Sequence, residues 1–579
     1  MKKKNVTGLT YYNTFLVVFF LLIIIGSGAT LLPRGRPLTE KELIQRIKAR
    51  PDDNSSRIAL AQIHIAKNDL DSAKEQLDRV ISGDPENAEA HNAMGLVYTR
   101  KGLYRDAELE LVKALNLDPD NPSIHTNIGN LAFQRKNFPM AIESYLRALQ
   151  IEPDNIQALA SLGSVYFEDR RYDEAEKIFR KLISISPRSP SGYNGLGNVL
   201  LAKLETDEAR AAYKKALQLD PDNLEAHVNL GGLYFKTRDI DLAEKEFIRG
   251  LELDPDNLKA HVGMGTVNLI RKRFDAAIKE AQKAIELDPH DDSLQVFLGE
   301  VYYEYRKFNK AIEHHKKAIE INPDSYDAYI AMGEAYRALN MYPEALEAFD
   351  RAKKIRPDFA DVYTCIATAY LKMGDYDRAI LEAKKAVKCD PEDEDARSIL
   401  ATSLARNKKY DEAETEFQKA LKINPRYEDS YIDRGIMYIQ QGEYDKAEAE
   451  FKKALEINPR YSEDTLVYMG DLQAARGRLS EAEKYYKEAQ AKTPLYDLAP
   501  SRLGDLYSKQ GKLILAREEY KKALYANPNL ESAILGLARL DMLEGKKEEA
   551  AMKIKKALKI NPLIRKKIEQ DQLLSLLLP

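Results

Sequence analysis

Two adjacent stretches decide the fold of this chain: residues 88–121, AEAHNAMGLVYTRKGLYRDAELELVKALNLDPDN, and residues 122–155, PSIHTNIGNLAFQRKNFPMAIESYLRALQIEPDN. Aligned without a gap, these two 34-residue stretches share glycine at position 8, alanine at positions 20 and 27, and proline at position 32. A pattern that returns at a fixed period of about 20 to 50 residues is typical of a repeat architecture. The repeats therefore set the organisation of the chain.

Prolines mark the same position along nearly the whole sequence. Fourteen of the fifteen intervals between them are 34 residues long. The exception is the 35-residue step from Pro459 to Pro494, which places one added residue near Tyr461–Thr465. The spacing predicts fifteen complete units. The prolines are Pro51, Pro85, Pro119, Pro153, Pro187, Pro221, Pro255, Pro289, Pro323, Pro357, Pro391, Pro425, Pro459, Pro494, Pro528 and Pro562.

Each unit is predicted to be a pair of helices. Position 20 is Ala in all fifteen units, position 27 is Ala in twelve, and position 8 is Gly in eleven and Ala in the other four. Glycine inside a helix costs about 1 kcal/mol relative to alanine, so its recurrence predicts a close approach of two helices. Positions 4, 7, 8 and 11 form the packed stripe of a first helix, and positions 20, 24 and 27 form that of a second. The proline ends the second helix.

This pattern resembles the tetratricopeptide repeat family over about Asn54–Leu563. The shared features are small residues at positions 8, 20 and 27, aromatic residues at 11 and 24, and proline at 32. The resemblance implies an all-α, right-handed superhelical solenoid of about 15 helix-turn-helix repeats. The chain departs from the family at position 4, where the family often has Trp, because it contains no Trp. It uses instead His91, His125, His227 and His261, or Tyr193, Tyr329, Tyr363 and Tyr431.

A stack of helix pairs needs a cap at each end. Thr39 and Glu42 have the spacing of a capping box, which predicts a helix that runs to Arg50. At the other end, residues 564–579 are expected to fold over the last repeat as a capping helix. The run Leu573–Leu578 is too short to span a bilayer, so we favour a cap over a second membrane contact.

The N-terminus differs in kind from the repeats. Asn5–Pro33 contains no charged residue. As a helix, Leu9–Leu32 would be about 36 Å long, against a hydrocarbon core of about 30 Å. We favour a transmembrane helix that anchors the chain. A cleaved signal peptide is the competing interpretation, because Lys2–Lys4 precede the apolar run and the small residues Ser27–Ala29 follow it.

The expected organisation follows from these segments: a tail over 1–8, the span over 9–32, a linker and capping helix over 33–53, the solenoid over 54–563, and the C-terminal cap over 564–579. The basic residues that follow the span outnumber those before it, which by count favours a cytoplasmic solenoid. Several of them belong to the predicted capping helix, however, and a lysine block at the N-terminus commonly stays inside. We therefore expect the solenoid on the outer, periplasmic or extracytoplasmic, side of the membrane.

Composition and motifs exclude several classes of function. The net charge of −4, from 88 basic and 92 acidic residues, argues against a nucleic-acid binder. The sequence has no phosphate-binding loop, no HExxH motif, no nucleophile elbow, and no region outside the repeats large enough for a catalytic domain. We expect no catalytic residue, no metal, no cofactor and no small-molecule substrate.

The histidines and cysteines are interpreted as structural. The four histidines at position 4 recur at multiples of 34 residues, too far apart to share one ion. His314 and His315 are adjacent on a helix, so they point in different directions. Two cysteines, Cys365 and Cys389, cannot form a disulfide framework, and we favour buried free thiols over a pair.

Candidate partner-binding residues lie at positions 2, 5, 9 and 12 of the first helices, opposite the packed stripe. The resemblance places these positions in a concave groove. In the N-terminal part they are amides, joined by position 6, which suit a peptide backbone of any sequence: Asn92, Asn127, Asn130, Asn194, Asn198 and Asn229. In the C-terminal part they are acids, which suit a basic segment: Glu300, Asp327, Glu334, Asp361, Asp395, Asp429, Asp464, Asp471 and Asp505.

Position 2 also has a structural interpretation, because acids in the first turn of a helix are favoured by its dipole. Position 9 lies two turns in, so its acids are better evidence for a property of the groove. Arg434 occupies position 7, which is apolar in every other unit. It is expected to reach water or to pair inside the solenoid, and with the added residue it predicts a local irregularity over about 430–470.

These observations favour a membrane-anchored, non-catalytic scaffold that assembles a multiprotein complex by binding proteins or extended peptides. One alternative is a substrate-presenting arm of a separate enzyme such as a glycosyltransferase. If the N-terminus is a cleaved signal peptide, the scaffold is secreted or periplasmic instead.

Overall fold

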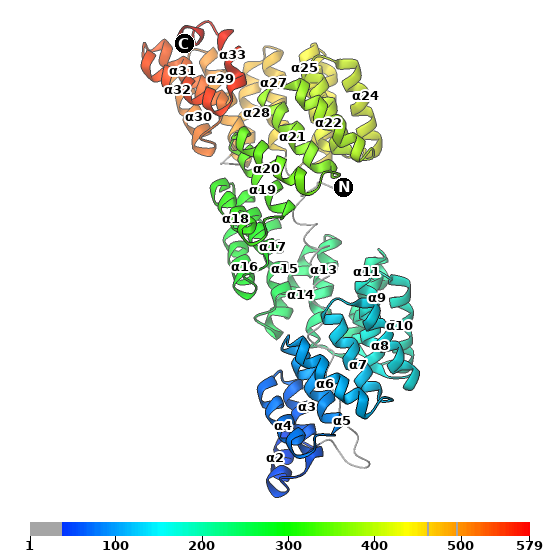
Figure 1. The fold of residues 1–579 in the computed structure, drawn as a ribbon. Helices are drawn as coiled ribbons and strands as arrows, with labels where there is room; N and C mark the ends of the chain where they lie inside the picture. The colour runs from blue at the N-terminus through cyan, green and yellow to red at the C-terminus, as the bar shows by residue number, and fades with distance from the viewer. Residues whose placement is uncertain (1–37, 460–461, 494–495, 579) are drawn as a thin grey trace. The chain divides into compact units, whose positions relative to one another are not determined.

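The computed structural model describes residues 38–459, 462–493 and 496–578. Within these ranges every regular element is a helix and no strand occurs. First and second helices alternate along the chain (Figure 1). The first helices are α3 (Asn54–Ala66), α5 (Ala88–Arg100), α7 (Pro122–Gln134), α9 (Ile156–Glu168), α11 (Pro190–Ala202), α13 (Leu224–Lys236), α15 (Leu258–Ile270), α17 (Asp292–Glu304), α19 (Tyr326–Ala338), α21 (Ala360–Met373), α23 (Glu394–Arg406), α25 (Glu428–Gln441), α27 (Glu463–Ala475), α29 (Leu498–Lys509) and α31 (Glu531–Leu543).

The second helices are α4 (Leu70–Gly83), α6 (Tyr104–Leu117), α8 (Phe138–Ile151), α10 (Tyr172–Ile185), α12 (Thr206–Leu219), α14 (Ile240–Leu253), α16 (Phe274–Leu287), α18 (Phe308–Ile321), α20 (Tyr342–Ile355), α22 (Tyr376–Cys389), α24 (Tyr410–Ile423), α26 (Tyr444–Ile457), α28 (Leu479–Lys492), α30 (Leu513–Ala526) and α32 (Lys547–Ile560). The predicted all-α solenoid of helix pairs is therefore confirmed. Each second helix ends just before the residue that precedes the repeat's proline, as the restriction before proline predicts.

The recurrent glycine at position 8 packs against the side chain at position 24 of the same repeat, which is a ring in most repeats. A Cβ added to Gly129 would lie 2.6 Å from a ring carbon of Tyr145, and one added to Gly333 would lie 2.4 Å from a ring carbon of Phe349. Real Cβ atoms do not approach other atoms this closely. The predicted close approach of the two helices is confirmed, and the group that requires it is the position-24 side chain, a ring in these repeats and Leu111 at Gly95.

The turn between first and second helix uses a left-handed residue in every unit. Position 15 has a positive φ in all fifteen repeats, with Gly at six of them and another residue at nine, such as Leu204 with φ 65°. The next residue donates its backbone N–H back to position 11, as from Glu205 to the carbonyl of Leu200 at 2.8 Å. This arrangement satisfies a carbonyl at the end of the first helix and reverses the chain.

Short elements cover both ends of the described solenoid. Thr39 and Glu42 form the predicted capping box at the start of α2 (Glu40–Ala49). After α32 the chain forms η1 (Pro562–Ile564), α33 (Arg565–Glu569) and η2 (Ser575–Leu577) in place of one continuous helix. Ile568 and Leu574 of this segment are buried against α31 and α32. The C-terminal segment thus protects the apolar face of the last repeat.

The predicted membrane span over 9–32 lies outside the described residues. Among the helices that the structure does describe, none is long and apolar enough to cross a membrane.

The described residues divide into two units, which meet between residues 267 and 268 of the sequence, and each is described by itself. In the first unit the largest fully buried rings include Tyr145, Tyr213 and Phe247, all at position 24. In the second unit Phe349 and Tyr520 hold the same position with Phe417 and Phe451 between them in the sequence. In both units position 24 therefore supplies most of the largest side chains of the core.

The two cysteines are free, as favoured from the sequence, but the expectation that both are buried is wrong for one of them. Cys365 is half-buried, whereas Cys389 is exposed at the end of α22. Cys389 is the last residue of a second helix and lies on its solvent side, whereas Ala386 one turn earlier is buried.

Candidate partner-binding groove

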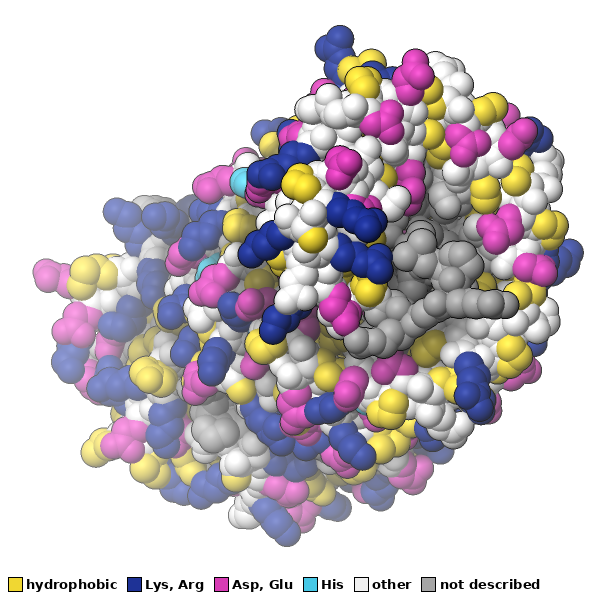
Figure 2. Space-filling view, turned by 90° about the horizontal axis from the view of Figure 1, so that it is seen from below, with side chains coloured by type: hydrophobic (Ala, Val, Ile, Leu, Met, Phe, Trp, Pro, Cys, Tyr) yellow, Lys and Arg dark blue, Asp and Glu magenta, His cyan; other side chains and the backbone are white. Residues whose placement is uncertain are grey.

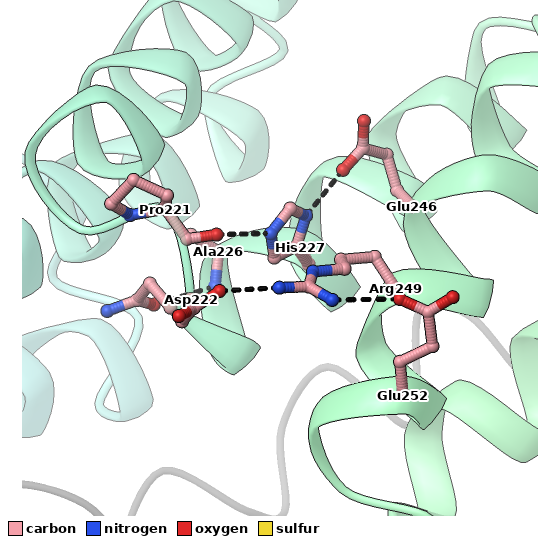
Figure 3. Close-up of polar contacts among 8 residues, drawn as sticks. Pro221, Asp222, Ala226, His227, Glu246, Arg249 and Glu252 are labelled. Atoms are coloured by element: carbon pink, nitrogen blue, oxygen red, sulfur yellow. Dashed lines mark hydrogen bonds and ion pairs between the residues drawn. The ribbon is translucent and has the colours of Figure 1, made fainter.

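Position 4 of the first helix links each repeat to the one before it. In Figure 3 the ring of His227 lies between the carbonyl of Pro221, with its Nε2 at 3.0 Å, and the carboxylate of Glu246, with its Nδ1 at 2.6 Å. Beside it Arg249 bridges Asp222 and Glu252. His125 Nε2 makes the same contact with the carbonyl of Pro119, at 2.9 Å.

Tyrosine and arginine make the same hydrogen bond at this position. Tyr363 and Tyr431 donate their hydroxyls to the carbonyls six residues earlier, those of Pro357 and Pro425, and Arg397 donates through Nε to Pro391. Any side chain with a suitably placed N–H or O–H therefore fits where the family often has Trp. The histidines at position 4 hold repeat junctions together, and this contact accounts for their periodic spacing.

Position 9 is paired with position 24 wherever position 24 is tyrosine. The hydroxyl of Tyr145 donates to Asn130 at 2.7 Å, and that of Tyr213 donates to Asn198 at 2.6 Å. In the second unit two further pairs have the same geometry: Tyr486 with Asp471 and Tyr520 with Asp505, both at 2.7 Å. Four of the candidate groove residues thus satisfy a buried hydroxyl of their own repeat.

The remaining amides of the first unit bond one another across repeats. Asn127 donates to Asn92 at 2.9 Å and Asn130 donates to Asn127 at 3.3 Å. In the same way Asn229 donates to Asn194 at 3.1 Å, so position 6 of one repeat contacts position 5 of the repeat before it. These residues form a ladder of amides in two separate parts, one from Asn92 to Asn130 and the other from Asn194 to Asn229.

The amide of Asn198 is only partly used. Asn198 is 2% exposed, and its Nδ2 has no hydrogen-bond partner, while its Oδ1 accepts from Tyr213. Because the side chain is buried, it serves the packing of its own repeat.

Three charged residues that the sequence analysis did not single out lie close to this ladder. Asn194 donates to Glu225 of α13 at 3.1 Å. The positive charge of Lys259 in α15 acts on the pKa of Glu225 and on that of Glu168 at the end of α9. Burial raises the pKa of Glu168 to about 7 and also raises that of Glu225, with Lys259 acting against both shifts. Burial lowers the pKa of Lys259. Glu225 and Lys259 lie in adjacent repeats, but Glu168 lies two repeats before Glu225, so sequence periodicity alone does not bring the three together.

The acids of the second unit fall into two groups at position 2. Asp395 accepts a hydrogen bond from the hydroxyl of Tyr427, and Asp464 accepts one from Tyr496. Burial first, and then the adjacent carboxylate, raises the pKa of each tyrosine. Where Asp395 and Asp464 have these tyrosines 32 residues later, Asp327 has Phe359 at the equivalent place, which cannot donate. Asp361 and Asp429 lie in the first turns of α21 and α25.

The other two acids lie at position 9 of repeats without tyrosine at position 24. Glu334 forms an ion pair with Arg337, one turn later in α19. Glu300 is 5% exposed in α17, next to the glycine on which the ring of His315 lies.

Arg434 pairs inside the repeat stack. Its Nη2 lies 2.8 and 2.9 Å from the two carboxylate oxygens of Glu450 in α26, and Nη1 lies 3.5 Å from Glu414 in α24. The expectation of an internal pair is confirmed, with carboxylates of the second helices as its partners. Both α25 and α26 keep a length of 14 residues, and the added residue falls near the stretch 460–461, outside the described residues.

On the face seen in Figure 2, lysine and arginine side chains are interspersed with aspartate and glutamate. Among the described residues no group of three or more histidine, cysteine or acidic side chains has the geometry of a metal site.

Comparison with known proteins identifies the repeats. Tetratricopeptide repeat models match residues 200–262, 303–369, 404–464 and 438–500, residues 58–122, 233–292 and 366–428, and residues 156–189 and 501–530. A further TPR repeat model matches residues 129–169. Together these matches cover most of the solenoid. The chain belongs to the tetratricopeptide repeat family, whose members are generally non-catalytic scaffolds for protein–protein interaction.

No curated protein sequence matches the chain significantly. Among solved structures, the crystal structure of the APC/C hetero-tetramer Cut9–Hcn1 is similar at 15% sequence identity and a TM-score of 0.48. The match covers 87% of this chain and 99% of the other.

Proposed function

We propose that this chain is a non-catalytic scaffold that binds partner proteins, or extended segments of them, along the concave groove of its solenoid. The observation that supports this most directly is a row of aspartates at position 2 of five consecutive first helices, α19 to α27. The row is Asp327, Asp361, Asp395, Asp429 and Asp464. One carboxylate per repeat suits an extended segment that presents lysine or arginine at regular intervals.

A binding measurement tests this part. The wild-type chain is compared with the variant D327N/D361N/D429N, which leaves both tyrosine-paired aspartates in place. An extended lysine-containing peptide and its glutamate counterpart serve as probes. We expect the lysine peptide to bind the wild type, to lose about tenfold or more in affinity with the variant, and to weaken with added salt.

The matched control carries the same change of charge on exposed acids of second helices, as E344Q/D411N/E412Q. It is expected to bind like the wild type. Equal binding of the peptide to wild type and D327N/D361N/D429N would remove the acidic row from the binding surface.

We further propose that residues 9–32 anchor the scaffold in a membrane, with the solenoid on the outer side. The uncharged segment long enough to span a bilayer and the lysines before it support this. The intact mass of the chain extracted from membranes distinguishes a retained anchor from a cleaved leader. Digestion of the solenoid by protease added to sealed cells, against no digestion until lysis, distinguishes the two orientations.

A further inference from the structure

In the unit 268–579 the chain returns to contact itself after more than five repeats. Asn527 donates through Nδ2 to the carbonyl of Ala338 at 3.2 Å, and Asn340 donates to the carbonyl of Asn529 at 3.1 Å. These partners are 189 residues apart in the sequence. Figure 1 shows α19 and α20 beside α29 and α30. We call this contact the seam.

The seam extends by one step on either side. Asn561 donates to the carbonyl of Met373 at 3.3 Å, and Arg306 lies 3.6 Å from Asp497. On one side of the seam lie the left-handed turns of consecutive repeats, and on the other lie the segments that precede the first helices of later repeats. Each successive turn on one side therefore contacts the next successive segment on the other side.

Each seam asparagine has a second, local contact. Asn527 accepts from the backbone N–H of Asn529 and also donates to Asp497 at 2.9 Å, while Asn561 accepts from Leu563. Asn527 is 3% exposed and Asn561 is 1% exposed. If the seam parts, their amide groups lose a partner, so the closed arrangement satisfies donors that the repeats alone do not.

Glu531, the first residue of α31, lies at the centre of the seam. One of its oxygens, Oε1, is buried without a hydrogen-bond partner. Burial, and then the charge of Glu531, raises the pKa of Tyr342 in α20. Tyr342 is buried, and its hydroxyl donates to Asn340 at 3.0 Å. Burial raises the pKa of Glu531 to about 7, with Asn561 and Lys567 acting against the shift.

The charged and titratable groups around Glu531 come from every element that meets there. Tyr342 faces it from α20 and feels Arg337 of α19 as well as Asp497. Arg306 lies next to Asp497 from the turn after α17, and Lys567 lies on α33. An ionised Glu531 therefore adds its charge to that of Asp497 at Tyr342, and the cations that act on these groups are Arg306, which Asp497 engages, Lys567 and Arg337.

We propose that the seam is a pH-sensitive latch, which holds the unit closed while Glu531 is protonated and weakens when this carboxyl group ionises. A protonated carboxyl group is tolerated at a buried contact, whereas an ionised one must be hydrated. In the open form the carboxyl group is hydrated and returns toward its ordinary pKa of 4.5. The proposal concerns the shape of this unit and does not depend on the identity of any partner.

The direction of the effect follows from the two pKa values. The carboxyl group binds its proton more tightly in the closed form, so closure is fully favoured below about pH 4.5. The equilibrium constant for closure declines as the pH rises, by at most about tenfold per pH unit, and levels off above about pH 7.

Distances between two spin labels in the full-length chain test the proposal. With Cys365 and Cys389 replaced by serine, labels are placed at the exposed positions Glu344 in α20 and Tyr525 in α30, on the two sides of the seam. We expect a single short distance at pH 5 and a growing population of longer distances at pH 8. A distance distribution that does not change with pH would overturn the proposal.

Two variants test whether Glu531 is the group whose ionisation opens the seam. Glu531→Gln keeps the shape of the side chain without its charge and is expected to stay closed at both pH values. Asn527→Ala removes the seam contact with the carbonyl of Ala338 without removing a group that acts on Glu531, and is expected to open at both. The matched control, Glu548→Gln on exposed α32 surface, should respond like the wild type. If Glu531→Gln opens with pH as the wild type does, Glu531 is not the titrating group and the latch as proposed is wrong.

Discussion

The hydroxyl of Tyr145 donates to Oδ1 of Asn130 at 2.7 Å, 15 residues earlier in the same repeat. The ring of this tyrosine lies on Gly129, and its side chain is 1% exposed. A polar residue at position 9 of the first helix is therefore part of the packing of the second helix. This packing role explains a polar residue at position 9 without any ligand.

We expect the two side chains to be energetically coupled. Tyr145→Phe leaves Asn130 without its donor, and Asn130→Ala leaves a buried hydroxyl unpaired, so each should destabilise α7 and α8 by about 1 kcal/mol. The double variant should cost little more than either single change. Amide hydrogen exchange of α7 and α8 measures the local stability, which is the relevant quantity in a repeat array. Additive losses would show that the hydrogen bond contributes nothing.

The glycine at position 8 predicts a steric effect. In Gly333→Ala the new Cβ would lie 2.4 Å from a ring carbon of Phe349, and we expect a net loss of about 1 to 3 kcal/mol despite the better helix propensity of alanine. Chemical denaturation followed by circular dichroism measures it. Gly83→Ala is the control, because nothing lies within 4 Å of a Cβ there, and it should be neutral or stabilising.

The left-handed turn predicts a stabilising substitution. Leu204 has φ 65° and is 72% exposed, so it contributes strain without burial. Leu204→Gly should raise the stability of the adjoining helices by about 0.5 to 1 kcal/mol. The reverse change at an equivalent turn, Gly102→Ala with φ 73°, should lower it by a similar amount. Thermal unfolding of both variants beside the wild type checks the pair, and the same sign for both would contradict the argument.

His315 predicts sensitivity to acid. It is fully buried at position 24 with neither ring nitrogen hydrogen-bonded, and burial lowers its pKa to about 3. The unfolded chain binds the proton with a pKa near 6.5, so stability is lost as the pH falls from about 6.5 toward 3, by about 2 kcal/mol at pH 5.

His315→Phe restores the ring that five other repeats carry at position 24. It should stabilise α17 and α18 by about 1 to 2 kcal/mol at pH 7 and remove most of this acid sensitivity. Hydrogen exchange of α17 and α18 at pH 5 and pH 7 compares it with the wild type. His290→Gln, at an exposed site, is the control and should leave the pH dependence unchanged.

The sequence predicted the helix pairs, the packed small residues and the capping box at Thr39 because each depends on contacts within one repeat or its neighbour. It did not predict what position 9 does, although the information was present. Asn or Asp occurs at position 9 in the four repeats with tyrosine at position 24, whereas the repeats of Phe179, Phe247 and Phe417 have Ser, Gly and Thr there. Comparing the two positions within each repeat would have found the pairing.

The seam and the cluster of Glu168, Glu225 and Lys259 lay beyond the same reasoning. Each joins repeats that are not neighbours, and the distance between such repeats depends on the small rotation from one repeat to the next, accumulated over several. A periodic pattern fixes which face a residue occupies but not this rotation. The contacts of these residues therefore required the structure.

The residue before a repeat's proline takes part in the contact of the chain with itself. At position 31 Asn527 and Asn561 each direct an amide N–H toward a carbonyl of an earlier repeat, whereas Asp118, Asp220 and Asp254 hold the same position in the first unit. An aspartate has oxygen where the amide nitrogen would be, and two oxygens facing each other repel. Asparagine alone does not create the contact, because Asn424 and Asn458 at the same position donate to Glu394 and Glu428 within their own repeats. Where an earlier carbonyl lies within reach, a single amide nitrogen at this recurring site turns the end of one repeat into a contact with another far away in the sequence.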